Sequence, residues 1–262
     1  MKPAAADRLT FAFHRLQERL SADGRFVPIE DLTGISGAPF RMYWKAWDAH
    51  SAAVCSGEPL RRAARAYGFE LASGDTYGEN EGFRAIEDQG PMTLRDRIDL
   101  FKKSIEEGQR LAHEEEYGGE GEGESDGGGH DDDEGGTDGE SPLQYASGFA
   151  AYRALASDIA PLRRTTAGDE TWLSLRAVFE SISISRRMCA LYLNHLANFI
   201  GVAPAIAPFR RESQALGEAS RIVASIVSGH GEDERSLVIP VLEAEDAYRE
   251  AIEALASARE PA

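Results

Sequence analysis

A stretch of acidic residues and glycines divides the 262-residue chain near its middle. Between Glu114 and Glu140 the sequence has 13 acids, 10 glycines and neither Lys nor Arg. Such a stretch has too little apolar surface to offset the loss of chain entropy on folding, so we expect it to be disordered. We therefore predict three parts, which are residues 1–113, an acidic Gly-rich disordered insertion at 114–141, and residues 142–262.

The acidic tract also carries most of the excess charge. The whole chain has a net charge of -17, whereas the residues outside the tract hold 32 acids and 28 bases. Their basic residues form short groups such as Arg163-Arg164, and phosphate binding needs larger clusters, so we expect no nucleic-acid partner. The chain has 24 Arg and four Lys. Such a preference for Arg is found in salt-adapted proteins and in products of GC-rich coding, and the sequence leaves both explanations open.

The apolar segments are too short for a membrane-spanning helix, which needs roughly 18 consecutive apolar residues. The longest candidate, Val202 to Phe209, is interrupted by two prolines. The first residues offer no apolar segment typical of a secretory signal. Cys55 and Cys189 are too few for a disulfide framework, so we expect free thiols and a cytoplasmic protein without a membrane partner.

Residues 1–113 alternate between helical and strand patterns. Leu9, Phe13, Leu16 and Leu20 recur at helical spacing, which predicts a first helix over 5–20. The same reasoning predicts a helical turn at 28–34, helices over 58–67 and 93–107, and strands at 40–44, 69–71 and 109–113.

Residues 142–262 show helical patterns and no persuasive strand. We predict helices over 143–159, 169–200, 208–227 and 232–258, with Pro240 kinking the last helix or marking its start. The predicted fold class is therefore a mostly helical α+β protein, with a C-terminal helical bundle.

Cys55 is the most plausible nucleophile in the sequence. It precedes the helix predicted to begin near Glu58, where backbone amides and the helix dipole lower the pKa of a thiol. With His50 or His113 as the base, it would give a thiol enzyme for acyl transfer or peptide hydrolysis. The alternative is that Cys55 fills space in a loop. Cys189 lies in an apolar helix pattern and is expected to be buried and inert.

The sequence predicts neither a metal site nor a cofactor. The helix of His195 lacks the Glu-x-x-His pattern of di-metal bundles. His130 stands beside Asp131–Asp133, which favours weak cation binding without a fixed geometry. The glycines of 118–123 follow no apolar strand, and the acids among them would repel phosphates, so we expect no nucleotide.

One short motif carries a family resemblance. The stretch from Asp31 to Arg41 contains Gly34, Ser36, Gly37, Phe40 and Arg41 at the spacing of a Gly-x-Ser/Thr-Gly-x-Ala-Phe-Arg signature. It is similar to a bacterial and archaeal group that resembles the N-terminal part of butirosin biosynthesis protein H and, more distantly, papain-like bacteriocin-processing peptidases. The order of elements and the stretch from Gly148 to Leu155 are similar as well. Ser36, which lies between Gly34 and Gly37, is typical of a turn rather than of a nucleophile.

The resemblance implies a reduced papain-like lobe before the helical bundle. A papain-like thiol site requires a cysteine at the start of the first helix, and the stretch from Arg8 to Phe11 contains none. It also requires a core strand with a histidine, and the acidic tract stands in that place. The leading hypothesis is therefore a non-catalytic protein that binds a protein or a small ligand on a degenerate scaffold. The alternatives are the thiol enzyme using Cys55 and a homo-oligomerisation module built on the bundle.

Overall fold

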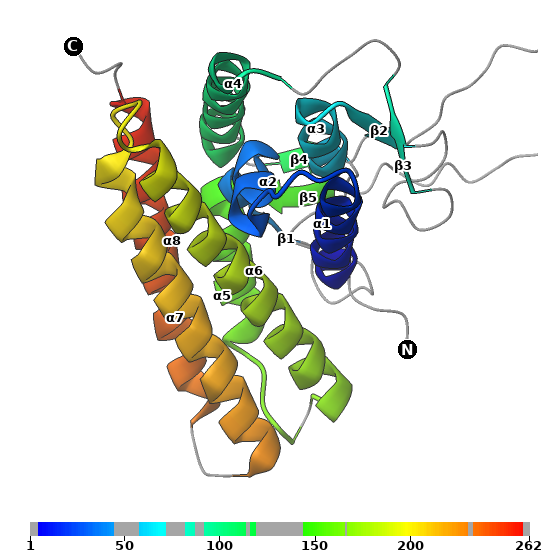
Figure 1. Cartoon of the computed structure of the whole chain (residues 1–262). Coiled ribbons are helices and arrows are strands. Elements are labelled where there is room, and N and C mark those ends of the chain that lie inside the picture. Colours follow the sequence, from blue (N-terminus) through cyan, green and yellow to red (C-terminus); the bar gives the residue numbers. More distant parts are fainter. Residues whose placement is uncertain are drawn as a thin grey trace, which may run out of the picture.

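The computed structural model describes residues 5–44, 58–71, 82–86, 92–113, 116–118, 144–165, 167–229 and 233–258 (Figure 1). It is mostly helical with small antiparallel sheets, which confirms the predicted α+β class. The helices are α1 (Ala5–Ala22), α2 (Ile29–Ile35), α3 (Glu58–Ala66), α4 (Leu94–His113), α5 (Gly148–Ile159), α6 (Asp169–Leu196), α7 (Ala203–Ser228) and α8 (Val238–Ala256), with the 3-10 turns η1 (Ala38–Phe40) and η2 (Glu234–Leu237).

The strands form two small antiparallel sheets. In the first, β5 (Gln144–Ser147) lies between β1 (Tyr43–Trp44) and β4 (Glu116–Gly118). In the second, β2 (Phe69–Leu71) pairs with β3 (Phe83–Ala85). The strand at 69–71 was predicted, and its partner strand was not. Disorder was predicted from Glu114 onwards, and this is wrong at β4, because its backbone pairs with β5. The rest of the acidic tract lies outside the described residues.

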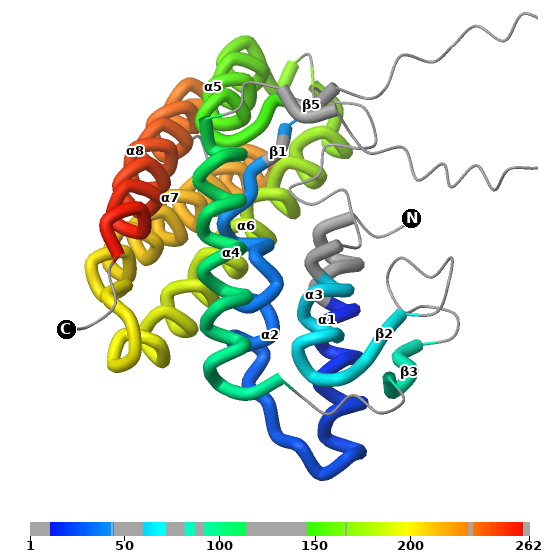
Figure 2. The backbone as a smooth tube through the Cα atoms, turned by 90° about the horizontal axis from the view of Figure 1, so that it is seen from above, coloured from blue at the N-terminus to red at the C-terminus, as the bar shows by residue number. Residues whose placement is uncertain are grey.

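The long helices α6, α7 and α8 lie side by side in Figure 1, and α5 packs against α8. Seen from above, α4 and α2 lie between these helices and the pair α1 and α3 (Figure 2). No helix in the described part of the chain is long and apolar enough to cross a membrane.

The two predicted halves share one hydrophobic core. Buried residues from both sides of the acidic tract belong to a single cluster. The ring of Phe40 makes edge contacts with Phe101 and Phe209, at centroid distances of 5.6 and 5.9 Å. The residues before and after the tract therefore pack as one body, although the limits of the three predicted parts stay a prediction.

The helix predicted over 93–107 was expected to end before Gly108, and this boundary is wrong. Helix α4 continues to His113, so the strand predicted at 109–113 does not form. A Cβ at Gly108 would lie 2.4 Å from the Cβ of Phe40. The glycine is therefore explained by the close approach of α4 to η1, and not by the end of a helix.

The predicted strand at 40–44 and the predicted helix over 143–159 are each partly wrong. Phe40 belongs to η1, and only Tyr43–Trp44 form a strand. Residues 144–147 form β5, and the helix begins at Gly148, which has a positive φ of 56°. The amide of Gly148 donates a hydrogen bond to the Met42 carbonyl at 2.8 Å, so contacts distant in sequence decide both boundaries.

Two prolines of the bundle, Pro204 and Pro240, lie in the first turns of α7 and α8. Helix α7 begins at Ala203, five residues before the predicted start, and Pro204 lies in its first turn, where the helix leaves N–H groups unused. Pro208 lies inside this helix and is buried. Helix α8 begins at Val238, so Pro240 marks its start, which is one of the two predicted outcomes.

Candidate functional site

The residues that carry the family resemblance lie inside the molecule. We name residues 34–41 the signature segment, which runs from α2 through η1. Within it Ser36 and Phe40 are fully buried and Arg41 is 6% exposed. Gly37 has a φ of 77°, a conformation that other residues rarely adopt, and it allows the turn between α2 and η1. The segment therefore offers almost no surface to a substrate.

The Ser36 hydroxyl makes two hydrogen bonds within this turn. It donates a hydrogen bond to the Thr33 carbonyl at 2.5 Å and accepts one from the Ala38 amide at 3.1 Å. Both bonds hold the chain where α2 ends and η1 begins. This agrees with the interpretation of Ser36 as a turn residue.

Gly34 lets α2 and α6 come together. A Cβ at this position would lie 2.0 Å from the Cδ1 atom of Tyr192 in α6. Any side chain would force the two helices apart, because atoms in a packed interior have no room to give way. Gly34 is therefore explained by the close packing of α2 against α6.

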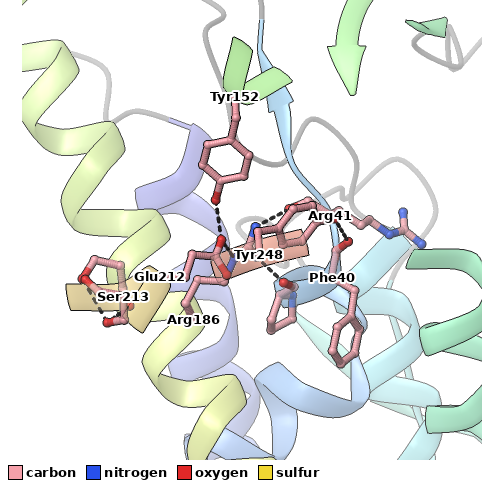
Figure 3. A network of polar contacts seen from close by, with 9 residues as sticks. Phe40, Arg41, Tyr152, Arg186, Glu212, Ser213 and Tyr248 are labelled. Atoms are coloured by element: carbon pink, nitrogen blue, oxygen red, sulfur yellow. Dashed lines mark hydrogen bonds and ion pairs between the residues drawn. The ribbon is translucent and has the colours of Figure 1, made fainter. Parts of the chain in front are cut away.

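Three successive carbonyls of the signature segment accept hydrogen bonds from the C-terminal helices (Figure 3). Arg186 of α6 donates to the carbonyl oxygens of Pro39 and Arg41, the latter at 3.1 Å. The Tyr248 hydroxyl of α8 donates to the Phe40 carbonyl at 2.8 Å. Buried carbonyls need such partners, so these bonds fix the segment to the bundle.

Arg186 is paired with a buried acid. Its Nε donates to Glu212 Oε1 at 2.6 Å, and the side chains are 1% and 0% exposed. The Tyr152 hydroxyl donates to the same oxygen. Burial raises the pKa of Glu212 against the opposing effects of Arg186 and Tyr152. The ion pair links α6 to α7 beneath the signature segment.

The sequence analysis did not predict this ion pair, although the position of Arg186 in its helix indicates a buried partner. Arg186 comes four residues after Ile182 and three before Cys189, in the middle of the apolar face of its helix. Lys, Arg, Asp and Glu are rarely buried without a partner. An arginine at that position therefore predicts a buried acceptor, but the sequence does not identify Glu212 as that acceptor.

A second cluster of charges joins the signature segment to α3 and α4. Arg41 Nη2 lies 2.8 Å from Glu107 Oε1, and Arg62 Nη2 lies 2.7 Å from Glu107 Oε2. Arg62 also donates to the Ser104 hydroxyl at 2.7 Å. Glu107 thus receives two guanidinium groups from different parts of the chain.

Glu107 should make part of the stability dependent on pH. Burial raises the pKa of its carboxyl, but Arg62 and Arg41 together outweigh burial and hold the pKa below the usual 4.5. A lowered folded-state pKa gives stability that is present above 4.5 and is lost as the pH falls through the folded-state value. We expect Glu107→Gln to cost about 1 to 2 kcal/mol at pH 7 and almost nothing near pH 3.

Urea unfolding at both pH values measures this effect. The exposed neighbour Glu106 is the control, because Glu106→Gln should leave the free energy of unfolding within about 0.5 kcal/mol of the wild type. A cost of Glu107→Gln that is the same at both pH values would contradict the role of its charge.

Of the three residues of the predicted thiol site, His113 is the one that the structure describes. Cys55 and His50 lie outside the described residues, so the thiol enzyme stays a prediction. His113 ends α4, and its ring makes an edge contact with Phe149 at 5.2 Å between centroids. Cys189 is fully buried, as predicted, and burial raises the pKa of its thiol.

His195 binds an acid of another helix. Its Nδ1 lies 2.9 Å from Asp31 Oδ1, which connects the end of α6 to α2. Among the described residues no three His, Cys, Asp or Glu side chains lie close enough together to hold a metal ion. His130 lies outside the described residues.

A groove lies where α4, the α6–α7 turn and the end of α8 meet. Its volume is about 310 Å³. Ile105, Val202 and Leu255 form an apolar wall, and Lys102 and Gln109 of α4 add polar groups. These side chains come from three separate stretches of the sequence, which is why no local pattern predicted the groove.

Comparisons with known proteins give no relative. The chain matches no family model, no curated protein and no solved structure. The resemblance to the papain-like group therefore stays a prediction.

Proposed function

We propose that this protein is a non-catalytic binding protein and that the groove between α4 and the end of α8 holds a small ligand. The observation that supports this most is the groove itself. Its volume of about 310 Å³ falls in the range of small-molecule sites, roughly 300–1,000 Å³.

The lining of the groove indicates the class of ligand. Ile105, Val202 and Leu255 favour an apolar body that is removed from water. Lys102 carries a positive charge and Gln109 an amide, and both donate hydrogen bonds. Glu106 lies at the same groove and disfavours a ligand with several negative charges. The expected ligand is a small amphipathic molecule with one anionic group.

The signature segment supports a role without catalysis. Ser36 is buried and hydrogen-bonded within a turn. Gly37 allows this turn, and Gly34 allows the close contact between α2 and α6. Arg41 is bound to Glu107. These residues hold the fold together, so the motif that suggested an enzyme family is explained by packing.

A fluorescent probe tests the groove. 1-Anilinonaphthalene-8-sulfonate has an apolar body and one sulfonate, and we expect it to bind in a saturable manner with a Kd of about 10 to 100 μM. Ala256 lies at the groove, and Ala256→Trp fills the space from an exposed position on α8. This variant should weaken binding about tenfold or more, since it occupies the ligand's place.

The control is Ser257→Trp, at the next position, which is exposed and does not line the groove. It adds the same side chain and should leave the affinity unchanged. Lys102→Gln should weaken binding about threefold to tenfold by removing the charge opposite the sulfonate. Probe binding that does not saturate, or that both tryptophan variants affect equally, would count against the groove as the site.

A further inference from the structure

Helix α6 presents three large aliphatic side chains to solvent. Leu173 is 47% exposed, Ile184 is 42% exposed and Leu191 is 38% exposed. Single exposed aliphatic residues are common on protein surfaces and need no explanation. These three, however, belong to one helix of 28 residues.

The three residues form one line along the helix. At about 100° per residue, Ile184 and Leu191 fall within about 20° of the direction of Leu173. The buried residues of α6, which include Leu175, Phe179 and Ile182, point to the opposite side. The line therefore runs along the middle of the solvent face, over about 27 Å.

The same face has the spacing of a helix–helix seam. Steps of four and three residues connect its members, as in the a and d positions of a coiled coil. We name this set the α6 seam, and it consists of Leu173, Ala177, Glu180, Ile184, Arg187 and Leu191.

The α6 seam is complementary to itself when two copies run antiparallel. With the two-fold axis beside residue 182, Leu173 of each copy faces Leu191 of the other. The long Arg187 then faces the small Ala177, which leaves room for it. Ile184 faces Glu180, whose methylene groups pack on it. The Glu180 carboxylate itself accepts a hydrogen bond from the Ser220 hydroxyl of α7 at 3.1 Å. Every position of the seam thus receives a partner that fits its size.

The charges favour the same arrangement. In the antiparallel pair, Arg187 lies one helical turn from Glu180 of the second copy. Glu180 is exposed and already binds Arg176 of its own chain at 2.8 Å. In the dimer its carboxylate would therefore lie near two guanidinium groups, that of Arg176 and that of Arg187 from the second copy. In a parallel pair, Glu180 would face Glu180 and Arg187 would face Arg187, and like charges in contact are unfavourable.

We propose that the solvent face of α6 is an interaction surface for a second copy of this chain, which forms an antiparallel α6–α6 dimer. Two helices meeting over this length bury less than the roughly 1,200 Å² of a strong interface, so the dimer is a weak one. We expect a dissociation constant of about 10 μM. This dimer is independent of the groove, which lies at α4 and the end of α8.

Light scattering of the full chain between about 1 and 500 μM tests the dimer. The mass should rise from 28.5 kDa towards twice that value. Ile184→Glu should raise the dissociation constant by about thirtyfold or more, because it places a charge in the seam. Ile239→Glu is the control, since Ile239 is 59% exposed on α8, outside the seam, and this variant should dimerise normally. A mass that stays at one chain throughout, or a dimer that Ile184→Glu leaves intact, overturns the proposal.

Cysteine cross-linking tests the direction of the helices in a Cys55→Ser background. Oxidation of a mixture of Leu173→Cys and Leu191→Cys proteins should give a covalent dimer, because these positions face each other. Each protein alone should stay uncross-linked, since identical positions then lie about 27 Å apart. Cross-linking of Leu173→Cys with itself would show a parallel pair and overturn the proposed arrangement.

Discussion

Replacing Arg186 by Met should lower the free energy of unfolding by about 3 to 5 kcal/mol, the expected cost of breaking a buried ion pair. The change leaves Glu212 buried without its cation and removes the donor to the Pro39 and Arg41 carbonyls. Methionine keeps most of the volume, so the loss reflects the missing polar contacts and not a large cavity. Urea unfolding at neutral pH measures the change.

The pH dependence separates lost charge pairing from a general packing defect. Without Arg186, burial should raise the pKa of Glu212 further, and a raised folded-state pKa of an acid makes stability fall as the pH rises through that value. The Arg186→Met protein should therefore gain stability on mild acidification relative to the wild type. Adding Glu212→Gln should restore part of the loss at neutral pH, since no buried charge then remains.

Arg210→Met provides the control for Arg186→Met. Arg210 is exposed on α7, and its replacement should change the free energy of unfolding by less than about 0.5 kcal/mol. A loss below about 1 kcal/mol for Arg186→Met would contradict the structural role assigned to the ion pair.

Gly148→Ala should cost about 3 to 4 kcal/mol, from strain and overpacking together. Gly148 has a φ of 56°, and a Cβ would lie 2.3 Å from the Cα and carbonyl oxygen of Ala112. Backbone atoms cannot swing away as a flexible side chain can. The end of α4 would have to move away from the start of α5, which also weakens the bond between Gly148 and Met42. Thermal and urea unfolding report the loss.

Gly24→Ala is the matched control for backbone conformation. Gly24 has a similar φ of 72°, but nothing lies within 4 Å of its added Cβ. Its replacement should cost about 1 kcal/mol, the effect of the conformation alone. Equal losses for the two variants would show that the contact with Ala112 contributes nothing.

Local patterns in the sequence predicted most helices because their apolar residues recur at helical spacing. The predicted first helix over 5–20 corresponds to α1, and the long helix over 169–200 corresponds to α6. The errors came from contacts between distant residues. Gly108 stays inside α4 because Phe40 packs on it, and the strand at 144–147 forms because β1 and β4 pair with it.

The candidate site was less predictable than the fold. The motif from Gly34 to Arg41 stood out in the sequence, but its bonding partners Arg186 and Tyr248 lie more than 140 residues away. The groove combines residues of α4 with the α6–α7 turn and the end of α8, so its lining exists only after folding. The exposed line on α6, by contrast, has a regular spacing that the sequence already contains.

The signature segment fixes α2 and η1 to α6 and α8, so we expect the residues before and after the acidic tract to unfold as one unit. Hydrogen exchange of backbone amides, followed by mass spectrometry of peptides from α2 and α6, tests this directly. We predict that the free energies of opening of the α2 and α6 peptides agree within about 1 kcal/mol. In Arg186→Met, both free energies should decrease by the same amount. Rapid exchange in α2 while α6 stays protected in the wild type would contradict unfolding as one unit.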